Sequence, residues 1–594
     1  MKLFFSLLLL TTLPFAPTLA QVELEPWGNL NGIRLHGRFI PFMTSLRVVS
    51  GDGTLIVSTA RDKQQPRYGR DGHRQWVTTR IDSLYFTEEV EDLGEGRARV
   101  HLTCYAAADQ HLEGIYFSLQ VPVEAGPPDT IVYTLPSGSH ALYSGTPTQA
   151  NIPLHEGDVS LGDTLKATID LRVSGPVDRA PVQLTVHADH PGRVFDGIGG
   201  NFRLQNPRLD PPVIDYNLSH LRVAWGRVEL PWRFWQPHLD DHPLDSFGHL
   251  PTVITQAMDM AARLSKMGIP IVLSAWSAPD WAVQGTYQPT NNHLDPTRIP
   301  DVCKSIADYI ACLHDHYGTE VRYFSLNESN IGINVRMTGE EHDAFIKALG
   351  AYLASRGLHT KLLLGDNGDA LDPAFIQPAL ADTAARPYIG AVSFHAWRGW
   401  DTAHLSPWSA AATQLGVPLL VAEGGIDAGA WRYPVLFQDP SYALKEIMIY
   451  TRILGVCQPT SILPWQLTSD YSLLAGNGLC GDNGMFRPTQ RFWNLRQLSA
   501  TPFGLHFLPV SCDRSDIECA ALGNPPKGGF AIHIVNNGAT CEAFIEGVPA
   551  AVKTLRVYVT SATKSMEVEA PLKVVGGKVA LKLEEGSFVT LVSQ

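Results

Sequence analysis

From about residue 194 to residue 500, short apolar runs alternate with longer stretches of helical periodicity. The runs that predict strands are 194–200, 219–223, 270–275, 321–326, 361–365, 389–394, 418–422 and 461–465. Between them lie predicted helices such as 251–266, 302–316, 339–356 and 442–454. Eight strands, each followed by a helix, within about 300 residues predict an α/β fold, the (β/α)8 or TIM barrel. A doubly wound open sheet is the alternative, although no GxGxxG sequence follows a strand to support it.

Strand-like segments flank this region on both sides. Residues 21–181 contain β-branched or alternating runs separated by Gly, Pro and Asp, which predict an N-terminal β-rich, sandwich-like domain. Strand patterns return in residues 501–594 and predict a C-terminal β-sandwich. The barrel domain is therefore assigned to 182–500, and its first residues, 182–193, are a candidate additional strand of the C-terminal sandwich.

The first twenty residues have the organisation of a signal peptide. Lys2 provides a positive start, Leu3–Leu10 an apolar core, and Thr18-Leu19-Ala20 a cleavage site before Gln21. The apolar core is too short to span a bilayer, and no later run is long enough. We therefore expect a secreted or periplasmic chain with no membrane insertion.

Charge and cysteine usage narrow the classes of partner. The net charge is −13 with 46 Lys and Arg residues that form no cluster, which argues against a nucleic-acid partner. The eight cysteines include no CxxC pair, and no HExxH sequence occurs, so we expect no metal and no cofactor. The sequence leaves the oligomeric state and the disulfide pairing open.

Polar and aromatic residues gather where the predicted barrel strands end. In this fold the active site forms at the carboxyl ends of the strands. Those positions are Asn201, Arg222, Trp276, Asn327, Glu328, Asp366, Asn367, His395, Glu423 and Trp465. The sequence therefore predicts a polar and aromatic basin at one end of the barrel.

Two of these residues, Glu328 and Glu423, form the most informative pair. Glu328 ends the fourth predicted strand and Glu423 the seventh, so their carboxyl groups are expected to face each other across the barrel mouth. Glycoside hydrolysis needs one carboxylic acid to protonate the leaving oxygen and one carboxylate to attack or to activate water. The alternative is that each is a solvated loop residue.

Tryptophan is concentrated in the same region: eleven of the thirteen lie between residues 225 and 493. Aromatic faces stack on the apolar faces of sugar rings while nearby polar groups bind the hydroxyls, which gives a ligand site mixed character. The candidates in loops after strands are Trp225, Trp232, Trp235, Trp276, Trp281, Trp397, Trp400 and Trp465, and some of them are expected to be core residues. The predicted partner is a carbohydrate.

Several motifs, in order, resemble the retaining glycoside hydrolases of clan A, and family 30 most of all. Residues 195–200, FDGIGG, resemble the D-G-F-G-G of the first strand, and residues 273–281, LSAWSAPDW, resemble the W-S-x-P-x-W/F of the third. Asn327-Glu328 stands where the family has Asn-Glu-Pro, and Glu423 where it has its second glutamate. Residues 487–498 resemble the helix that leads into the C-terminal β domain of the family.

The resemblance implies roles for individual residues. Glu328 would be the acid/base and Glu423 the nucleophile of a double displacement. Asn327 would bind the sugar 2-hydroxyl, Arg222 and His395 would support the site, and Trp465 would form the floor of the sugar subsite. Trp276, Trp397 and Asn201 are further expected substrate contacts.

The sequence departs from the family at Ser329, which replaces a proline, and at residues 395–397, HAW, where a tyrosine-type aromatic is common. The N-terminal domain has no counterpart in the simplest members. The sequence therefore predicts an exported retaining β-glycoside hydrolase acting on a glycan or glycoconjugate. The alternatives are a non-catalytic carbohydrate-binding protein on a barrel scaffold, or an inverting glycosidase or transglycosylase of a neighbouring family.

Overall fold

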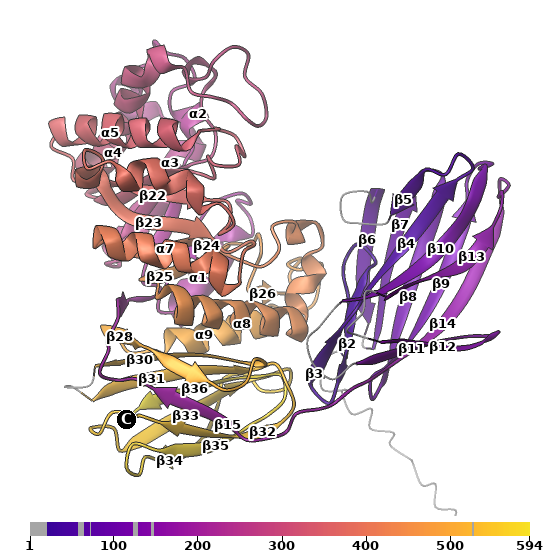
Figure 1. The fold of residues 1–594 in the computed structure, drawn as a ribbon. Coiled ribbons are helices and arrows are strands. Elements are labelled where there is room, and N and C mark those ends of the chain that lie inside the picture. Colours follow the sequence, from indigo (N-terminus) through magenta and orange to yellow (C-terminus); the bar gives the residue numbers. More distant parts are fainter. Residues whose placement is uncertain (1–20, 58–63, 72, 123–128, 144–147, 525–527) are drawn as a thin grey trace, which may run out of the picture.

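The computed structural model describes residues 21–594 except 58–63, 72, 123–128, 144–147 and 525–527. The predicted signal peptide, residues 1–20, lies outside the described residues. Three parts follow one another along the chain: an N-terminal β domain, a barrel surrounded by helices, and a C-terminal β-sandwich (Figure 1). The predicted fold class is thereby confirmed.

The barrel is a nine-stranded sheet in which all pairings are parallel. Its first strand is divided at Gly199, so that β17 pairs with the last strand and β18 with the second, which closes the sheet. The strands are β17 (Gly197–Ile198), β18 (Gly200–Asn201), β19 (Gly226–Leu230), β20 (Ile271–Ala275), β21 (Val321–Leu326), β22 (Lys361–Asn367), β23 (Ile389–His395), β24 (Leu419–Gly424) and β25 (Ser461–Pro464).

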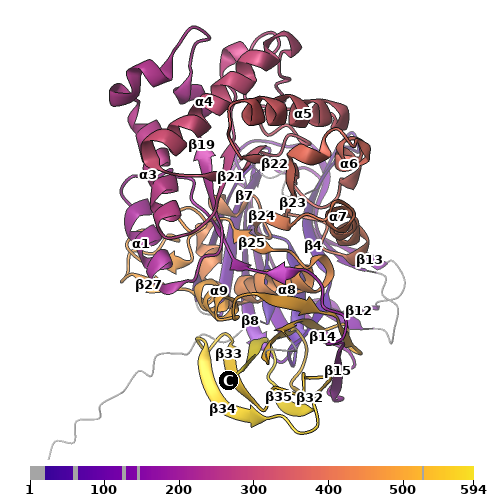
Figure 2. The ribbon, with the colours of Figure 1, turned by 90° about the vertical axis from the view of Figure 1, so that its left-hand side faces the viewer.

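Helices cover the outside of the barrel (Figures 1 and 2). They are α1 (Asp210–His220), α2 (Trp232–Trp235), α3 (Thr252–Lys266), α4 (Ile299–Tyr317), α5 (Gly339–Ser355), α6 (Gln377–Ala381), α7 (Thr402–Leu415), α8 (Pro440–Cys457) and α9 (Gln490–Ser499). The long helices are amphipathic, and their apolar faces join the strand side chains in one continuous core. Among the described residues, no helix is long and apolar enough to cross a membrane.

The predicted second strand, 219–223, is wrong. Residues 210–220 form helix α1, which begins with prolines in its first turn and ends at His220. The strand is β19, Gly226–Leu230, a short segment with charged residues at two of its five positions. Its polarity concealed it in the sequence, whereas the alternating Leu221 and Val223, which follow α1 and belong to no strand, imitated one.

The C-terminal sandwich consists of two sheets around their own core. One contains β29 (Val510–Cys512), β15 (Val182–Val186), β32 (Cys541–Glu546) and β35 (Val579–Leu583). The other contains β16 (Val194–Phe195), β28 (Leu505–Leu508), β30 (Ile517–Asn524), β31 (Gly529–Asn536), β36 (Ser587–Ser593), β33 (Thr554–Thr560) and β34 (Glu567–Lys573). Strands β15 and β16 precede the barrel in the chain, so the sandwich is built from both sides of it.

The N-terminal domain consists of three antiparallel sheets around a separate core. The smallest contains β1 (Val22–Leu24), β2 (Leu30–Leu35) and β3 (Arg38–Pro41). The second contains β13 (Thr148–Glu156), β10 (Leu112–Val121), β4 (Met43–Ser50) and β5 (Leu55–Val57). The largest contains β12 (Gly138–Tyr143), β11 (Thr130–Leu135), β14 (Thr164–Ser174), β9 (Arg97–Ala106), β8 (Leu84–Gly94), β7 (Arg74–Ile81) and β6 (Gln64–Asp71).

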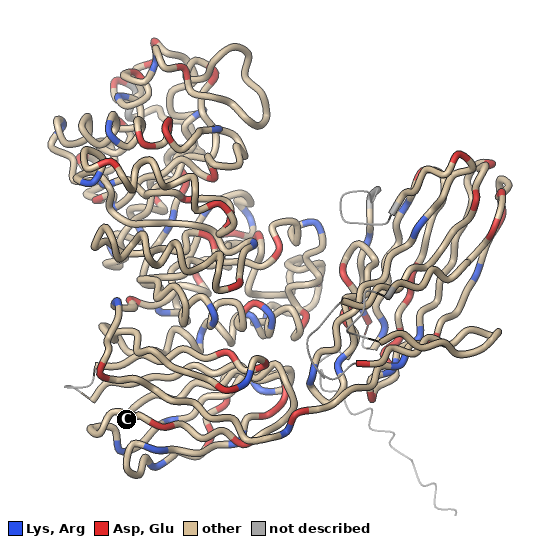
Figure 3. The backbone as a smooth tube through the Cα atoms, in the orientation of Figure 1, with Lys and Arg blue, Asp and Glu red and all other residues tan. Residues whose placement is uncertain are grey.

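The N-terminal domain lies beside the barrel, on the side where α8 and the short strand β26 (Leu474–Ala475), which pairs with β27 (Arg487–Pro488), are found (Figure 1). Arg70 of β6 forms an ion pair with Asp439, the residue that caps the start of α8. Arg34 of β2 donates to the carbonyl of Asn537 in the C-terminal sandwich at 3.4 Å. Acidic and basic residues are interspersed along all three parts (Figure 3).

Candidate active site

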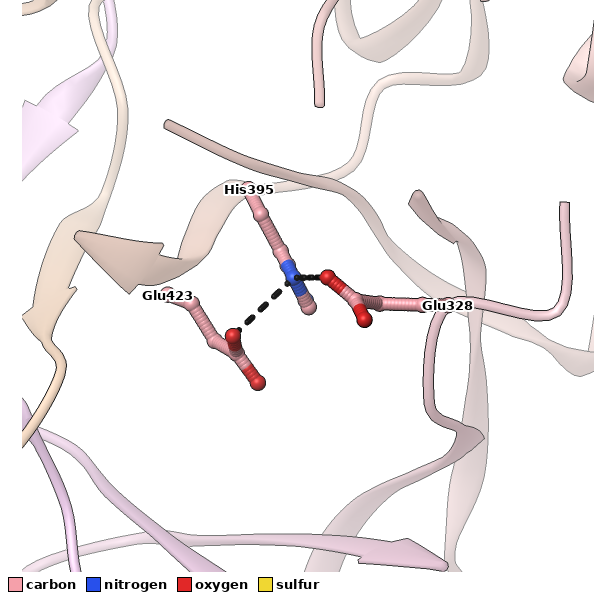
Figure 4. Close-up of side chains that lie close together, drawn as sticks. All are labelled: Glu328, His395 and Glu423. Atoms are coloured by element: carbon pink, nitrogen blue, oxygen red, sulfur yellow. Dashed lines mark hydrogen bonds and ion pairs between the residues drawn. The ribbon is translucent and has the colours of Figure 1, made fainter. Parts of the chain in front are cut away.

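Glu328 and Glu423 lie close together at the carboxyl end of the barrel, as the sequence predicts. Glu328 follows β21 and Glu423 lies in β24, and a histidine from β23 stands between them (Figure 4). One ligand atom from each of Glu328, His395 and Glu423 lies within 4.8 Å of the others. The side chains reach the same space from three different strands because the carboxyl ends of parallel strands meet at one end of a barrel.

His395 links three carboxyl groups. Its Nδ1 is 3.0 Å from Glu328 Oε1 and 3.3 Å from Glu423 Oε2, and its Nε2 is 3.0 Å from Asp366 Oδ1. Burial by itself lowers the pKa of His395, but the charges of Glu423 and Asp366 raise that pKa well above its usual value. The imidazole is therefore an imidazolium that donates from both nitrogens.

Arg227 of β19 holds the other side of the cluster. Its Nη1 donates to Glu423 Oε1 at 2.7 Å and to Asn201 Oδ1 at 3.0 Å. Its Nη2 donates to Asn327 Oδ1 at 2.6 Å and to Asp366 Oδ2 at 3.0 Å. Nη2 also donates to Ser274 Oγ at 3.0 Å. The planar guanidinium thus orients five side chains from five barrel strands or strand ends, a task for which a single ammonium has the wrong geometry.

Asp366, at the end of β22, is fully buried beneath the two glutamates. Its carboxylate accepts hydrogen bonds from the hydroxyls of Ser325 at 2.6 Å and Ser274 at 3.3 Å. Burial alone would raise the pKa of this carboxyl, but Arg227 and His395 hold it well below its usual range. Asp366 is therefore the permanent counter-ion of the two buried cations.

The two glutamates have opposite electrostatic environments. Burial raises the pKa of Glu328, and the nearby charge of Glu423 raises it further. Burial also acts to raise the pKa of Glu423, but His395 and Arg227 outweigh it and lower that pKa below its usual value. With Glu328 protonated, two cations face two anions, so the buried cluster is electrically balanced.

The backbone is strained where two of these residues are presented. Glu328 has φ 48° and Asp366 has φ 60°, in the left-handed region that side-chain-bearing residues seldom adopt. Such residues cost on the order of 1–3 kcal/mol each and concentrate at functional sites. The Glu328 amide donates to the Asp366 carbonyl at 3.2 Å, so the two strained ends support each other.

The cluster also has the spacing of a metal site, since Glu328, His395 and Glu423 could each offer one ligand atom. A metal ligand histidine must present a free nitrogen lone pair. The charges of Glu423 and Asp366 raise the pKa of His395, which favours protonation of both ring nitrogens, and Arg227 already pairs with Glu423.

Three of the predicted tryptophans surround the glutamates. Trp397 donates from Nε1 to Glu423 Oε2 at 3.2 Å. Trp276 stacks over the Arg227 guanidinium at 4.4 Å and lies 5.7 Å from the ring of Trp465. Asn327 also lines the cavity above the glutamates, whereas the amide of Asn201 is engaged by Arg227 and by the carbonyls of Ala422 and Leu463. Asn201 therefore positions Arg227 and lies beneath the cavity.

Arg222 does not lie in the site. It follows helix α1, donates to the Thr501 carbonyl and stacks over Phe503 at 3.8 Å, on the side of the C-terminal sandwich. Its assignment depended on the wrong second strand. Arg227, five residues later, is the arginine that contacts Glu423, and an alternating pattern over residues 226–230 was the signal that could have revealed it.

Four other predicted tryptophans are structural. Trp232 and Trp235 donate to the hydroxyl and the carbonyl of Ser305 in the helical layer. Trp281 donates to the Gln236 carbonyl, and Trp225 bonds Asp196. Their indole nitrogens are satisfied within the fold, so they stabilise the barrel and do not contact the glutamates.

Two cavities open beside Glu328. The first, of about 710 Å³, contains both glutamates and the three tryptophans Trp276, Trp397 and Trp465. The second, of about 510 Å³, contains Glu328 and Trp397 but not Glu423. Glu328 therefore lies at the boundary between the two cavities and shares the larger one with Glu423.

Comparisons with known proteins identify the fold of this chain. No model of a known protein family matches the sequence, and no curated protein matches it. Among solved structures, a glycoside hydrolase family 30 subfamily 8 xylanase from Clostridium acetobutylicum matches with a TM-score of 0.57 and 15% identity, over 69% of this chain and 99% of that one. A family 30 endoxylanase from Clostridium papyrosolvens matches with a TM-score of 0.57 and 14% identity, over 69% of this chain and 100% of that one. An endo-β1,6-glucanase matches with a TM-score of 0.50 and 16% identity, over 78% of this chain and 99% of that one.

The share covered by the two xylanases corresponds in length to the barrel and the C-terminal sandwich together. Identities this low establish the fold and not the substrate. The chain therefore has the fold of the clan A glycoside hydrolases, in the form found in family 30.

Proposed function

We propose that the protein is an exported retaining β-glycoside hydrolase that cleaves a glycan or glycoconjugate by double displacement. The observation that carries the proposal is the pairing of Glu328 and Glu423 around His395 in opposite electrostatic environments. A carboxylic acid and a carboxylate at one site are what glycoside hydrolysis requires. The solved structures with this fold, xylanases and a β-1,6-glucanase by their names, support the same class of reaction.

In the first step, the Glu423 carboxylate attacks the anomeric carbon of the sugar. The bond from that carbon to the glycosidic oxygen breaks, and Glu328 transfers its proton to the departing oxygen. Arg227 and His395 keep Glu423 ionised, while burial keeps Glu328 protonated. The products of the step are a glycosyl ester of Glu423, a free leaving group and an ionised Glu328.

In the second step, water attacks the anomeric carbon of the ester. Glu328, now a carboxylate, removes a proton from that water, and Glu423 leaves with the electron pair of the ester bond. Loss of the negative charge on Glu423 during the ester stage removes the repulsion that disfavours ionised Glu328. The same carboxyl group therefore acts first as acid and then as base.

The short separation of the carboxyl groups supports a retaining outcome. Their ligand atoms lie within 4.8 Å of each other. Retaining enzymes place their carboxyl groups about 5–5.5 Å apart, whereas inverting enzymes leave about 6.5–9.5 Å for a water molecule. We therefore expect direct attack by Glu423.

The signal-peptide organisation of residues 1–20 supports export with cleavage after Ala20. The backbone nitrogen of Gln21 lies 2.8 Å from Asp92 Oδ2. Cleavage would place the new α-ammonium group against that carboxylate and form an ion pair. N-terminal sequencing of the protein recovered outside the cytoplasm should begin at Gln21, and a chain that keeps residues 1–20 would contradict the proposed processing.

The experiment that tests the catalytic proposal is a screen of β-linked glycans and aryl β-glycosides, followed by variants of both glutamates. Glu328→Gln and Glu423→Gln should each lose nearly all turnover of the substrate that the screen identifies. Glu320→Gln is the matched control, because Glu320 is exposed at the opposite end of the same strand as Glu328. A wild-type protein that binds glycans without cleaving any would favour the carbohydrate-binding alternative.

Azide distinguishes the two roles. With an activated aryl glycoside, Glu328→Ala in azide should give the β-glycosyl azide, since azide replaces the second-step water. Glu423→Ala should give the α-glycosyl azide, since azide replaces the nucleophile. The first sugar released by the wild type should have the β configuration by NMR; an α product would show inversion, and a new glycoside as main product would show transglycosylation.

A further inference from the structure

We propose that the N-terminal domain forms one wall of the subsite that receives the leaving group, and that this subsite accepts an uncharged sugar in preference to an acidic one. The inference depends on the proposed hydrolase function and adds a task for a domain that lies outside the barrel. The proposed leaving-group subsite is the smaller of the two cavities beside Glu328.

That cavity lies between the N-terminal domain and the mouth of the barrel. The domain contributes Glu23, Leu24, Glu25, Trp27 and Gln75, all from β1, the turn after it, or β7. The barrel contributes loops after β21, β22, β23 and β24 and one face of α8. The enclosed volume of about 510 Å³ falls in the range of small-molecule sites.

The position of Glu328 identifies the side of the reaction. Glu328 lines both cavities, whereas Glu423 lines only the larger one. The nucleophile contacts the sugar that becomes the ester, so that sugar occupies the larger cavity. The acid protonates the oxygen of the departing group, which must therefore lie on the far side of Glu328, in the cavity that the N-terminal domain closes.

The domain wall is held in place by hydrogen bonds from within its own fold. The amide of Leu24 donates to Gln75 Oε1 at 3.3 Å, and Gln75 Nε2 donates to the Val22 carbonyl at 3.0 Å. The ion pair between Arg70 and Asp439 fixes the domain to the start of α8, close to the cavity. The wall is therefore formed before any ligand binds, as in most small-molecule sites.

The lining has the mixed character that sugars require. Half-buried Trp27 and Trp400 offer aromatic surfaces, one from each domain. Lys445 of α8 lies over the Trp400 ring at 5.9 Å, and its charge acts on Glu25. Burial raises the pKa of Glu25 to about 7. Near neutral pH this carboxyl can therefore donate a hydrogen bond to a sugar hydroxyl or accept one from it.

The distribution of charge favours a neutral ligand. Among the charged side chains of the cavity, Glu23 pairs with Arg34, Asp439 with Arg70, and Arg398 with Asp369 at 2.6 Å. The remaining described groups are three acids, Glu25, Asp427 and the protonated Glu328, against one cation, Lys445. Above pH 7, where Glu25 is ionised, a sugar carboxylate placed there would meet a net negative charge, whereas neutral hydroxyls would not be repelled.

The first test compares two substrates with the same reacting sugar, in the full-length protein. One is the disaccharide of the sugar identified by the screen, and the other is its glycosyl fluoride, whose leaving group is a single atom. Trp27→Ala should lower kcat/KM for the disaccharide about 10-fold, the loss of one sugar–aromatic contact, and leave fluoride hydrolysis within about twofold. Trp27→Phe should recover most of the loss.

Trp76→Ala is the matched control, because Trp76 follows Gln75 in β7, is 37% exposed and does not line the cavity. It should leave both substrates unaffected. Equal losses on disaccharide and fluoride for Trp27→Ala would show a structural role and overturn the subsite, as would no loss on either. A wild type that cleaves neither substrate would overturn the proposed function itself, and the subsite with it.

The second test concerns charge. Two substrates with the same reacting sugar are compared, one with a neutral leaving sugar and one with the corresponding uronic acid. The wild type should prefer the neutral substrate at pH 8 and low salt, and Glu25→Gln should narrow the preference several-fold because one negative charge is removed. An unchanged preference in Glu25→Gln, or a wild-type preference for the uronic acid, would contradict the charge argument.

Discussion

Arg227 donates to the carboxylate of Glu423 at 2.7 Å from a guanidinium with no exposed surface. The same group also contacts Asp366 at 3.0 Å and Asn327 at 2.6 Å. A buried cation of this kind is stable only because two carboxylates neutralise it, and it fixes the position of both. Arg227 therefore fixes the geometry of the cluster and, together with His395, keeps Glu423 ionised.

We expect Arg227→Lys to lower kcat at least 100-fold, because an ammonium cannot make the same set of planar hydrogen bonds to Glu423, Asp366 and Asn327. The change also removes contacts from a buried pair, so the unfolding midpoint should fall. Activity assays and thermal unfolding measure the two effects. Arg222→Lys is the control and should leave kcat within twofold; a larger loss there would contradict the position of Arg222 outside the site.

The pH dependence of kcat/KM should be bell-shaped, with limbs set by the coupled glutamate pair. The lowered pKa of Glu423 places the acid limb at low pH, and the raised pKa of Glu328 extends the alkaline limb. His395 favours ionisation of both groups. His395→Gln should therefore move both limbs to higher pH.

The measurement is the kcat/KM profile of His395→Gln relative to wild type, whatever its absolute activity. His404→Gln is the control, because His404 is half-exposed in the first turn of α7 and bonds Asp401. Its profile should coincide with that of the wild type. A profile of His395→Gln that keeps its limbs, or moves them to lower pH, would contradict the imidazolium assignment.

Asp366→Asn should destabilise the protein by about 3–5 kcal/mol, because it leaves the two buried cations facing the single charge of Glu423. The folded-state pKa of Asp366 is depressed, so its stabilising effect is fully present above the usual carboxyl pKa of about 4 and is lost as pH falls through the depressed value. The difference in the free energy of unfolding between wild type and Asp366→Asn should therefore be constant between pH 5 and pH 8. Exposed Asp240→Asn should change stability by less than about 0.5 kcal/mol.

Gly425→Ala should reduce kcat at least 10-fold while the protein stays folded. A Cβ at position 425 would lie 2.2 Å from the Trp397 ring, so the indole must move, and its hydrogen bond to Glu423 would be lost. Gly248→Ala is the control, because a Cβ there meets nothing within 4 Å. Loss of activity in both variants, or in neither, would contradict the role given to Trp397. The intrinsic fluorescence of Gly425→Ala would report the displacement of the Trp397 ring.

The residues at the ends of the predicted barrel strands include Glu328, His395 and Glu423, the most important part of the site. Glu328, His395 and Glu423 were predicted because buried parallel strands appear as apolar runs, and the residue that ends each run must point to one end of the barrel. Asp366 was found at a strand end, but its burial beneath the glutamates depends on neighbours from other strands. The sequence also placed Trp276, Trp397 and Trp465, which line the cavity, but could not separate them from Trp232 and Trp235, which do not.

Local pattern therefore determined the barrel, its flanking β domains and the two facing glutamates, because periodicity and strand ends are properties of neighbouring residues. Tertiary structure decided the rest. Arg227 replaces Arg222 because a short polar strand has little apolar signal, and only its pairing with β18 and β20 shows that it is a strand. The cavity shared by Trp27 and Lys445 joins residues about 400 positions apart, and no local pattern encodes a contact between two separately folded domains.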